Sequence, residues 1–427
     1  MKPLSEGPSA MRHSAWFDRR RLSTAADWIA IALVASLPWS TSATGILVVA
    51  WLLAALPTLD TADIRRVLRT PAGALPVALW GLAVAGLLWA DVPWAERLDG
   101  LSPFHKLLLI PLLMAYFRHS ERGRAILLAF LASCTLLLVI SWAIYFVPSA
   151  SPFAIRSAGV PVKDYISQSA MFTICACIVG YVGIDRWRQR QWAATLVLGL
   201  LGMAFLVNIP VIAVSRTAFI VAPLLLAVLA FREFGWKGIA FFGGGLILVV
   251  ASVWPLSSSF QSRVLSFFEE VKSYHIQQGQ ARSTPAGERL EFWRKSVVFI
   301  SEAPLIGHGT GSITDQFRRA AGTDLAEKTV GATISANPHN QTFAVAIQLG
   351  LAGALLLWGM WLVHFLMFRG PGFLAWGGFV VITQNVLGSL FNSHLFDFTH
   401  GWTYVLGVGI ASGLLIQQQN PRPNGMS

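Results

Sequence analysis

The chain has 427 residues, of which 55% are hydrophobic and only 12% are charged. About a quarter of the residues in a soluble domain are charged, so this composition excludes an ordinary soluble globule. The formal net charge of +11 does not indicate a nucleic-acid partner, because membrane proteins collect Lys and Arg in their cytoplasmic loops. Long apolar runs, rather than alternating strands of about ten residues, predict an all-α polytopic membrane protein.

Residues 1–24 are polar and basic, and we interpret them as a retained cytoplasmic tail, because no small-residue cleavage site follows the first apolar segment. Apolar segments then recur along the chain and predict a bundle of about 12 transmembrane helices. The predicted segments are 28–37, 43–58, 73–90, 104–117, 124–147, 165–184, 192–209, 213–231, 237–255, 341–367, 372–391 and 402–417.

Positive charge alternates between successive connections. Arginines follow the second, fourth and sixth segments, and Arg or Lys also follows the eighth and tenth, whereas the connections between them hold few. Short positive loops stay in the cytoplasm, so both termini of this multi-pass protein are predicted to be cytoplasmic; in the inner membrane of a Gram-negative cell, the long polar stretch would then be periplasmic. This alternation of the connections between the two sides of the membrane divides the chain into three parts. They are residues 1–256 with helices 1–9, a periplasmic loop domain at 257–340, and residues 341–427 with helices 10–12.

The long polar stretch has helical periodicity of its own. Apolar residues recur at helical spacing in 260–274 and 287–300, and a short helix is expected at 313–319. Ala303-Pro304 ends the second of these, and Gly307 to Gly311 forms a turn; this G-x-G-x-G follows no strand, so it is no dinucleotide fingerprint. We expect these helices to lie over the mouth of the membrane domain.

Two arginines at the predicted periplasmic face are candidate ligands of a diphosphate. Arg216 begins a crossing, and Arg289 lies near the start of the helix at 287–300. Taken singly, Arg216 could extend to lipid headgroups and Arg289 could form a solvated ion pair with a nearby Glu. Together, two guanidinium groups can hold a diphosphate with forked hydrogen bonds, a geometry that Lys cannot match.

His339 is the candidate general base. It follows Asn337-Pro338 and precedes Asn340 and a long apolar helix, which places it at a helix N-terminus on the membrane surface. A surface histidine usually has no special role. Here the helix N-terminus and nearby arginines disfavour the imidazolium, so we expect a neutral ring that can accept a proton from a sugar hydroxyl.

A further polar cluster lies between the last two predicted crossings. His394, Asp397 and His400 could contact substrate, bind a metal, or simply stabilise the loop. Lys106, at the start of the fourth crossing, is a possible phosphate contact or a lysine that extends to the interface. We include Asn340 among the possible substrate contacts, and we predict no metal and no cofactor.

These motifs resemble those of the O-antigen ligase family. The resemblance rests on Arg216, on Gly287-Glu288-Arg289 through Trp293, on the turn 303–309 and on Asn337-Pro338-His339-Asn340, in this order within a bundle of about 12 helices. It implies an inverting, metal-independent transfer of polysaccharide from undecaprenyl diphosphate to a sugar hydroxyl of lipid A–core in the periplasm. In that reading Arg216 and Arg289 hold the donor diphosphate and His339 is the base.

Other functions remain open at this stage. An O-antigen polymerase or a protein O-oligosaccharyltransferase would use the same class of donor, and only the acceptor separates them from a ligase. A transporter of lipid or polysaccharide would need ionisable residues near the middle of the membrane. The predicted helix interiors are almost free of charge, which favours the enzyme.

Overall fold

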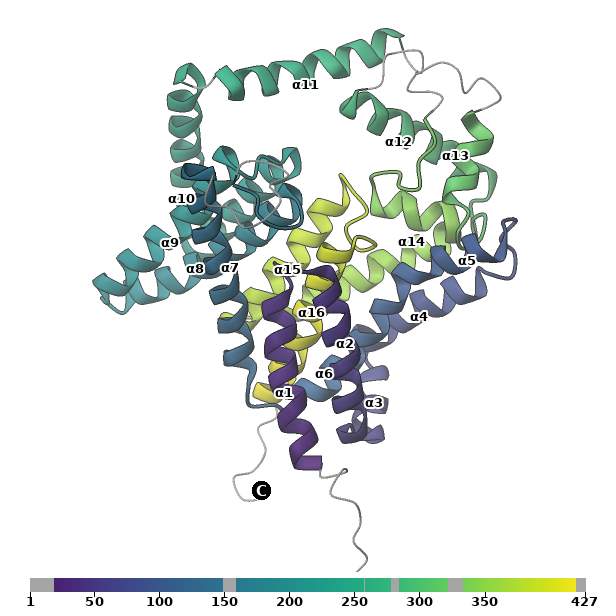
Figure 1. The fold of residues 1–427 in the computed structure, drawn as a ribbon, viewed down its shortest axis with the longest axis horizontal. Helices are drawn as coiled ribbons and strands as arrows, with labels where there is room; N and C mark the ends of the chain where they lie inside the picture. Colours follow the sequence, from purple (N-terminus) through teal and green to yellow (C-terminus); the bar gives the residue numbers. More distant parts are fainter. Residues whose placement is uncertain (1–18, 149–158, 257, 278–283, 322–332, 420–427) are drawn as a thin grey trace, which may run out of the picture.

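The structure is a computed structural model that describes residues 19–148, 159–256, 258–277, 284–321 and 333–419. Over these residues it is built from helices and contains no strand (Figure 1), which confirms the all-α fold class. The helices are α1 (Arg19–Ser36), α2 (Thr41–Ala55), α3 (Thr61–Leu68), α4 (Pro71–Ala85), α5 (Trp94–Leu101), α6 (Leu109–Phe117), α7 (Gly123–Phe146), α8 (Tyr165–Arg188), α9 (Trp192–Val211), α10 (Arg216–Val253), α11 (Ser258–Gln277), α12 (Pro285–Glu302), α13 (Ile313–Ala321), α14 (Gln341–Met367), α15 (Phe373–Ser389) and α16 (Phe398–Gln419).

Every apolar segment predicted from the sequence lies on a helix, and the three helices expected in the polar stretch are α11, α12 and α13. Two short helices, α3 and α5, were not predicted. Helix α1 begins at Arg19, so the end of the predicted tail is helical, while residues 1–18 lie outside the described part of the chain.

Seven helices of the described residues are long and apolar enough to cross a membrane, or eight if α3 and α4, bent by 85°, form one broken span. The chain is therefore a multi-pass membrane protein, and the count of twelve stays a prediction. Helix α10 is broken at Gly235 (φ 63°, ψ −149°), between the predicted segments 213–231 and 237–255. Its two halves therefore correspond to two predicted crossings.

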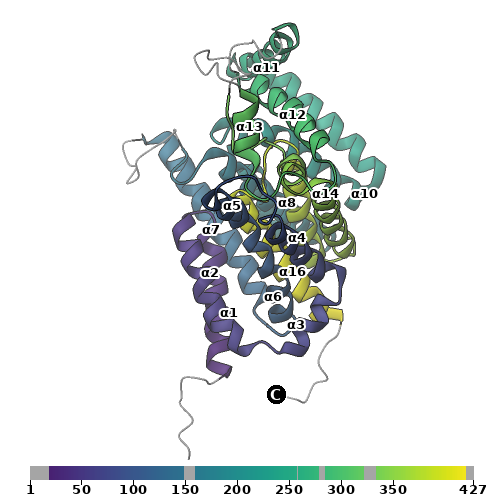
Figure 2. The same cartoon turned by 90° about the vertical axis from the view of Figure 1, so that its right-hand side faces the viewer.

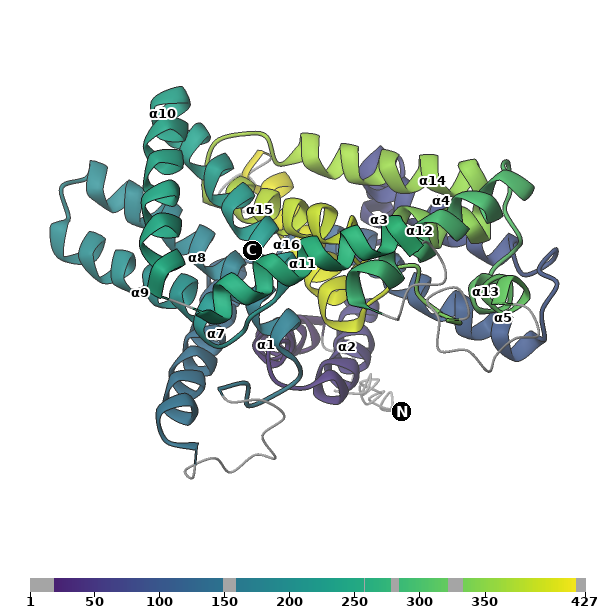
Figure 3. The same ribbon diagram turned by 90° about the horizontal axis from the view of Figure 1, so that it is seen from above.

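The centre of the bundle is formed by α16, which packs on α6 and α15. Around it, α1 packs on α2 and α7, α8 on α9, and α14 on α4 (Figures 2 and 3). Large buried side chains such as Trp51, Phe117, Trp376 and Tyr404 fill this core. Helices α11, α12 and α13 lie together at one face, and α1 begins and α16 ends at the opposite face (Figures 1 and 2).

A backbone pairing fixes the polar helices to the bundle. Helix α14 breaks at Gly350 (φ 61°, ψ −158°), and the turn after α12 enters the break. We call this pairing of residues 304–309 with 347–352 the interlock. Its hydrogen bonds run from Leu351 N to Pro304 O (2.8 Å), Ala352 N to Leu305 O (3.1 Å), His308 N to Ile347 O (2.9 Å) and Gly309 N to Gln348 O (2.9 Å). The break leaves backbone groups of α14 without helical partners, and the turn supplies those partners.

The same turn reaches a second helix. Thr310 N donates to Gly86 O at the end of α4 (3.1 Å), and the Thr310 hydroxyl donates to Ala83 O (2.6 Å). The glycines of the predicted turn are required by close approach: Gly307 packs against the backbone of Gln348, and all three glycines have positive φ. The turn 303–311 is thus a structural connector, and no nucleotide-binding loop.

We predict that Gly350→Ala destabilises the protein. A Cβ at this position would lie 2.4 Å from the backbone of Leu305, and the positive φ disfavours any residue with a side chain. We expect a loss of about 1–3 kcal/mol, measured as a lower thermal unfolding temperature in detergent. The control is Gly199→Ala in α9, where a Cβ meets no atom within 4 Å. An unchanged unfolding temperature for Gly350→Ala would contradict the interlock.

Candidate functional site

The first side chain of the candidate site is Arg216, at the start of α10. Its NH1 and NH2 groups donate to the two carboxylate oxygens of Glu270 on α11, each at 3.1 Å. The Glu270 carboxylate also accepts a hydrogen bond from Ala286 N in the first turn of α12, at 3.1 Å. One carboxylate therefore joins α10, α11 and α12 at the face opposite the start of α1.

Arg289 lies one residue after the first turn of α12. The Thr284 hydroxyl caps this helix by accepting from Gly287 N (3.2 Å), and Pro285 occupies the first helical position, where no N–H is needed. The pKa of Arg289 is lowered, first by burial and then by the charge of Arg216, while Glu270 acts in the opposite direction. The two guanidinium groups and Glu270 therefore share one electrostatic environment.

His339 faces the same helix. Residues 289, 292 and 293 lie at i, i+3 and i+4, so they project from one side of α12. The Phe292 ring stacks on the His339 ring (centroids 6.0 Å apart, planes at 16°), and Trp293 Nε1 donates to His339 O (3.4 Å). Helix α12 thus places the Arg289 guanidinium on the side that faces the imidazole.

The charge state of His339 follows from these neighbours. Burial lowers the pKa of His339 below its ordinary value of 6.5, and the positive charge of Arg289 lowers it further. The hydrogen bond to Asn392 and the charge of Glu288 act the other way without reversing the shift. The imidazole is therefore neutral at neutral pH.

The polar contacts of Asn392 determine which ring nitrogen carries the proton. Ser393 N donates to Asn392 Oδ1 (2.9 Å), which identifies that atom as the oxygen. His339 Nδ1 lies 3.1 Å from the same oxygen. Because a carbonyl oxygen only accepts, Nδ1 must carry the hydrogen, and the lone pair of the neutral ring is on Nε2.

Asn337 holds this arrangement together. Its Oδ1 accepts from His339 N (2.8 Å) and from the Ser393 hydroxyl (2.7 Å), so its Nδ2 is the atom that donates to Asn392 Oδ1 (2.8 Å). His339 itself has a positive φ of 53°, a conformation that these bonds support. The result is an imidazole with a defined orientation and tautomer.

Asn340, predicted as a possible substrate contact, has a structural position. Its side-chain oxygen caps α14 by accepting from Phe343 N (3.2 Å), and its Nδ2 donates to Leu390 O (3.2 Å). The cap begins α14 immediately after His339, so Asn340 fixes the distance between the histidine and the helix.

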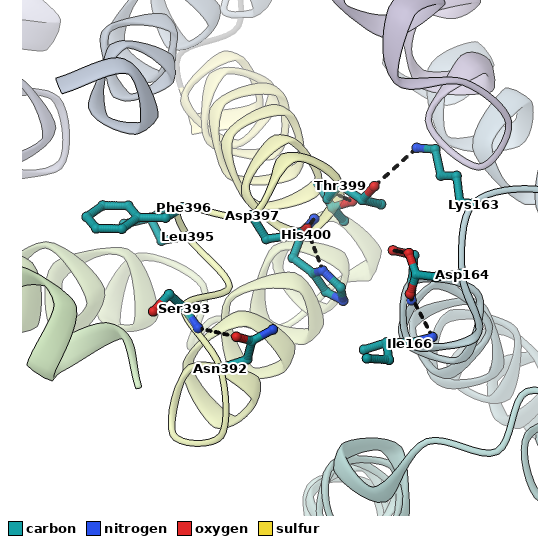
Figure 4. A network of polar contacts seen from close by, with 12 residues as sticks. Lys163, Asp164, Ile166, Asn392, Ser393, Leu395, Phe396, Asp397, Thr399 and His400 are labelled. Atoms are coloured by element: carbon teal, nitrogen blue, oxygen red, sulfur yellow. Dashed lines mark hydrogen bonds and ion pairs between the residues drawn. The ribbon is translucent and has the colours of Figure 1, made fainter. Parts of the chain in front are cut away.

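Lys106 anchors the loop between α15 and α16. Lys106 is buried, and its Nζ donates to the carbonyl oxygens of Leu395 (3.1 Å), Phe396 (3.2 Å) and Asp397 (2.9 Å). Its ammonium group is thus used to hold the loop, which gives a phosphate contact by Lys106 no geometric support. Figure 4 shows the polar network of this loop, including the bond between Asp397 and His400.

His394, Asp397 and His400 form a compact internal group. Asp397 Oδ1 accepts from His400 N (2.9 Å) and is bonded to His400 Nδ1 (2.8 Å), and the His394 ring stacks on His400 with centroids 4.0 Å apart. Burial lowers the pKa of His394. Burial alone would raise the pKa of Asp397, but the bonds and charge of His400 lower it. Within the described ranges no three His, Cys, Asp or Glu side chains are placed to hold a metal ion.

The sequence predicted Arg216, Arg289 and His339 as site residues, and the structure connects all three through α12. It missed Glu270, Phe292 and Asn392 as parts of this site. Asn392 belongs to the polar run that was read as an outer loop, and this run was its available signal. Nothing in the sequence around Glu270 distinguishes it from the neighbouring Glu269.

Comparison with protein families gives one finding. Residues 201–358 match the O-antigen ligase family, a stretch that includes Arg216, Glu270, Arg289 and His339. No curated protein matches the chain. The family acts on lipid-linked glycans in membranes, as a ligase or polymerase. The chain is therefore a multi-pass membrane protein in which residues 201–358 are similar to the O-antigen ligase family.

Proposed function

We propose that the protein is an O-antigen ligase of the inner membrane that works in the periplasm. It transfers a polysaccharide from undecaprenyl diphosphate to a sugar hydroxyl of lipid A–core, with inversion at the anomeric carbon and without a metal. The observation that supports this best is the convergence of two guanidinium groups and one neutral imidazole of defined tautomer beside α12.

In this proposal His339 is the general base. The acceptor hydroxyl attacks the anomeric carbon of the donor sugar and gives its proton to Nε2, the ring nitrogen with the free lone pair. The bond from the anomeric carbon to the diphosphate oxygen breaks as the new glycosidic bond forms. Asn392 keeps the opposite nitrogen protonated and stabilises the imidazolium that results.

Arg216 and Arg289 act on the leaving group. Negative charge develops on the diphosphate oxygen as the glycosidic bond to it breaks, and two guanidinium groups already in place stabilise that charge without reorganisation. Forked N–H groups also fix the orientation of the diphosphate, which sets the line of attack. The division into domains at 1–256, 257–340 and 341–427 fits this scheme, since residues from all three would form the site.

We predict that His339→Ala lowers kcat by about a hundredfold to ten-thousandfold and leaves donor affinity nearly unchanged. Asn392→Ala should lower kcat by about tenfold or more, again without a matching change in the KM for donor, because it acts only on the orientation and tautomer of the imidazole. The measurement is steady-state transfer with purified protein. The control is His119→Ala, since His119 contacts Asp63 and lies outside the site. Full activity of His339→Ala would remove the general base.

Arg289 yields a prediction with two separable parts. Arg289→Lys keeps the charge but loses the forked pair of N–H donors. We therefore expect a higher KM for donor and an unchanged acid limb of the pH–rate profile. Arg289→Gln removes the charge that lowers the pKa of His339, so that pKa rises and the acid limb moves to higher pH. In the native protein this limb should lie below pH 6.5. An acid limb that stays fixed in Arg289→Gln would separate Arg289 from His339.

The acceptor distinguishes a ligase from a polymerase and from a protein O-oligosaccharyltransferase. Purified protein is incubated with lipid-linked glycan and either lipid A–core, an acceptor protein or no acceptor. Product on lipid A–core is the expected result. Lengthening of the lipid-linked chain itself would assign a polymerase, and glycan on the protein would assign a protein O-oligosaccharyltransferase.

A further inference from the structure

The Glu270 carboxylate lies where an anionic ligand would be expected. It accepts both forked donors of Arg216 at 3.1 Å and the N–H of Ala286 at the α12 N-terminus at 3.1 Å, and its side chain is only 15% exposed. Guanidinium groups and helix N-terminal N–H groups are the donors that proteins use for phosphates. Among the anions that protein side chains can supply, a carboxylate most closely resembles a phosphate.

The second arginine lies in the same environment. Glu270 and Arg216 act on Arg289 with opposite signs, so the carboxylate lies within electrostatic reach of both guanidinium groups. Two arginines close together repel one another in the absence of an anion. Glu270 offsets this repulsion while no substrate is bound, at the cost of occupying the forked donors of Arg216.

We propose that Glu270 is a placeholder for the donor diphosphate: it occupies the arginine site in the empty enzyme, and the diphosphate displaces it. This inference rests on the proposed function. The forked face of Arg216 cannot bind Glu270 and a phosphate at once, and like charges so close disfavour simultaneous occupancy. Binding of the donor therefore breaks the three hydrogen bonds by which Glu270 joins α11 to α10 and to the start of α12.

A placeholder also acts on the product. After transfer, the lipid diphosphate remains on the two arginines, and its departure leaves them without an anion. The return of the Glu270 carboxylate competes with the product for Arg216 and favours release. Glu270 thus weakens diphosphate binding and assists turnover, two effects that a purely structural ion pair would not combine.

The test measures binding of inorganic pyrophosphate to the full-length protein in nanodiscs by calorimetry. Glu270→Gln should bind pyrophosphate about tenfold more tightly, since one competing charge is removed. Glu269→Gln is the matched control: it makes the same charge change on the same helix at an exposed neighbour, and it should shift the affinity much less. In transfer assays Glu270→Gln should lower both KM for donor and kcat, because the product leaves slowly.

Other outcomes overturn the inference in distinguishable ways. Equal or weaker pyrophosphate binding by Glu270→Gln and by Glu270→Ala, with binding still dependent on Arg216, would show that Glu270 positions Arg216 rather than competes with the ligand. Binding that is unaffected by Arg216→Gln and Arg289→Gln would remove the diphosphate site and the proposed function with it. Thermal unfolding of each variant identifies any loss of fold.

Discussion

The interlock between the turn 304–309 and the broken middle of α14 sets how α12 lies against α14, and with it the placement of Arg289 relative to His339. His339 immediately precedes α14, and Arg289 is on α12, which ends where the turn begins. Because the turn is bonded on both sides of Gly350, α12 cannot shift along α14 without loss of four backbone hydrogen bonds. Each lost bond would leave a backbone group without its partner, and this cost holds the register of α12 on α14.

In addition to this backbone pairing, the site depends on the placement of charge. A half-buried arginine near a second arginine is costly, and the charges of Glu270 and Glu288 offset part of that cost. The same field acts on His339, whose proton it disfavours. One cluster of charges therefore sets two properties: the charge environment of the two guanidinium groups, and the lowered pKa of the imidazole. The two properties cannot be varied independently, since Arg289 contributes to both.

The sequence identified the parts that depend on local patterns. Apolar runs predicted the segments from α1 to α16, and Arg232 and Lys237 marked the turn at Gly235 that divides α10. The break of α14 was not predicted, because Gly350 is a single glycine within an apolar run and its partners are about 45 residues earlier in the chain. Helix α3 carries too many charges, and α5 is too short and polar, to be recognised as part of an apolar pattern.

The same difference between local patterns and partners far away in the chain explains which residues of the site could be predicted. Arg216, Arg289 and His339 were predicted because their residue types suit one chemistry and because each lies beside a predicted helix end. The contact of Glu270 with Arg216 spans 54 residues and that of Asn392 with His339 spans 53, and no local pattern encodes such contacts.

The loop from Asn392 to His400 shows how a polar cluster can serve a site without supplying its reactive groups. Its histidines and Asp397 bond and stack with one another, and Lys106 anchors the carbonyl groups of 395–397. Gln341, in the first turn of α14, accepts from Leu395 N and Phe396 N, which ties the loop to the helix that follows His339. These contacts hold residues 395–397 in place, and the loop in turn holds Asn392 against the imidazole. In the proposed mechanism, a substitution at His400 would therefore act on catalysis through the position of the Asn392 oxygen, while His339 would remain the group that accepts the proton.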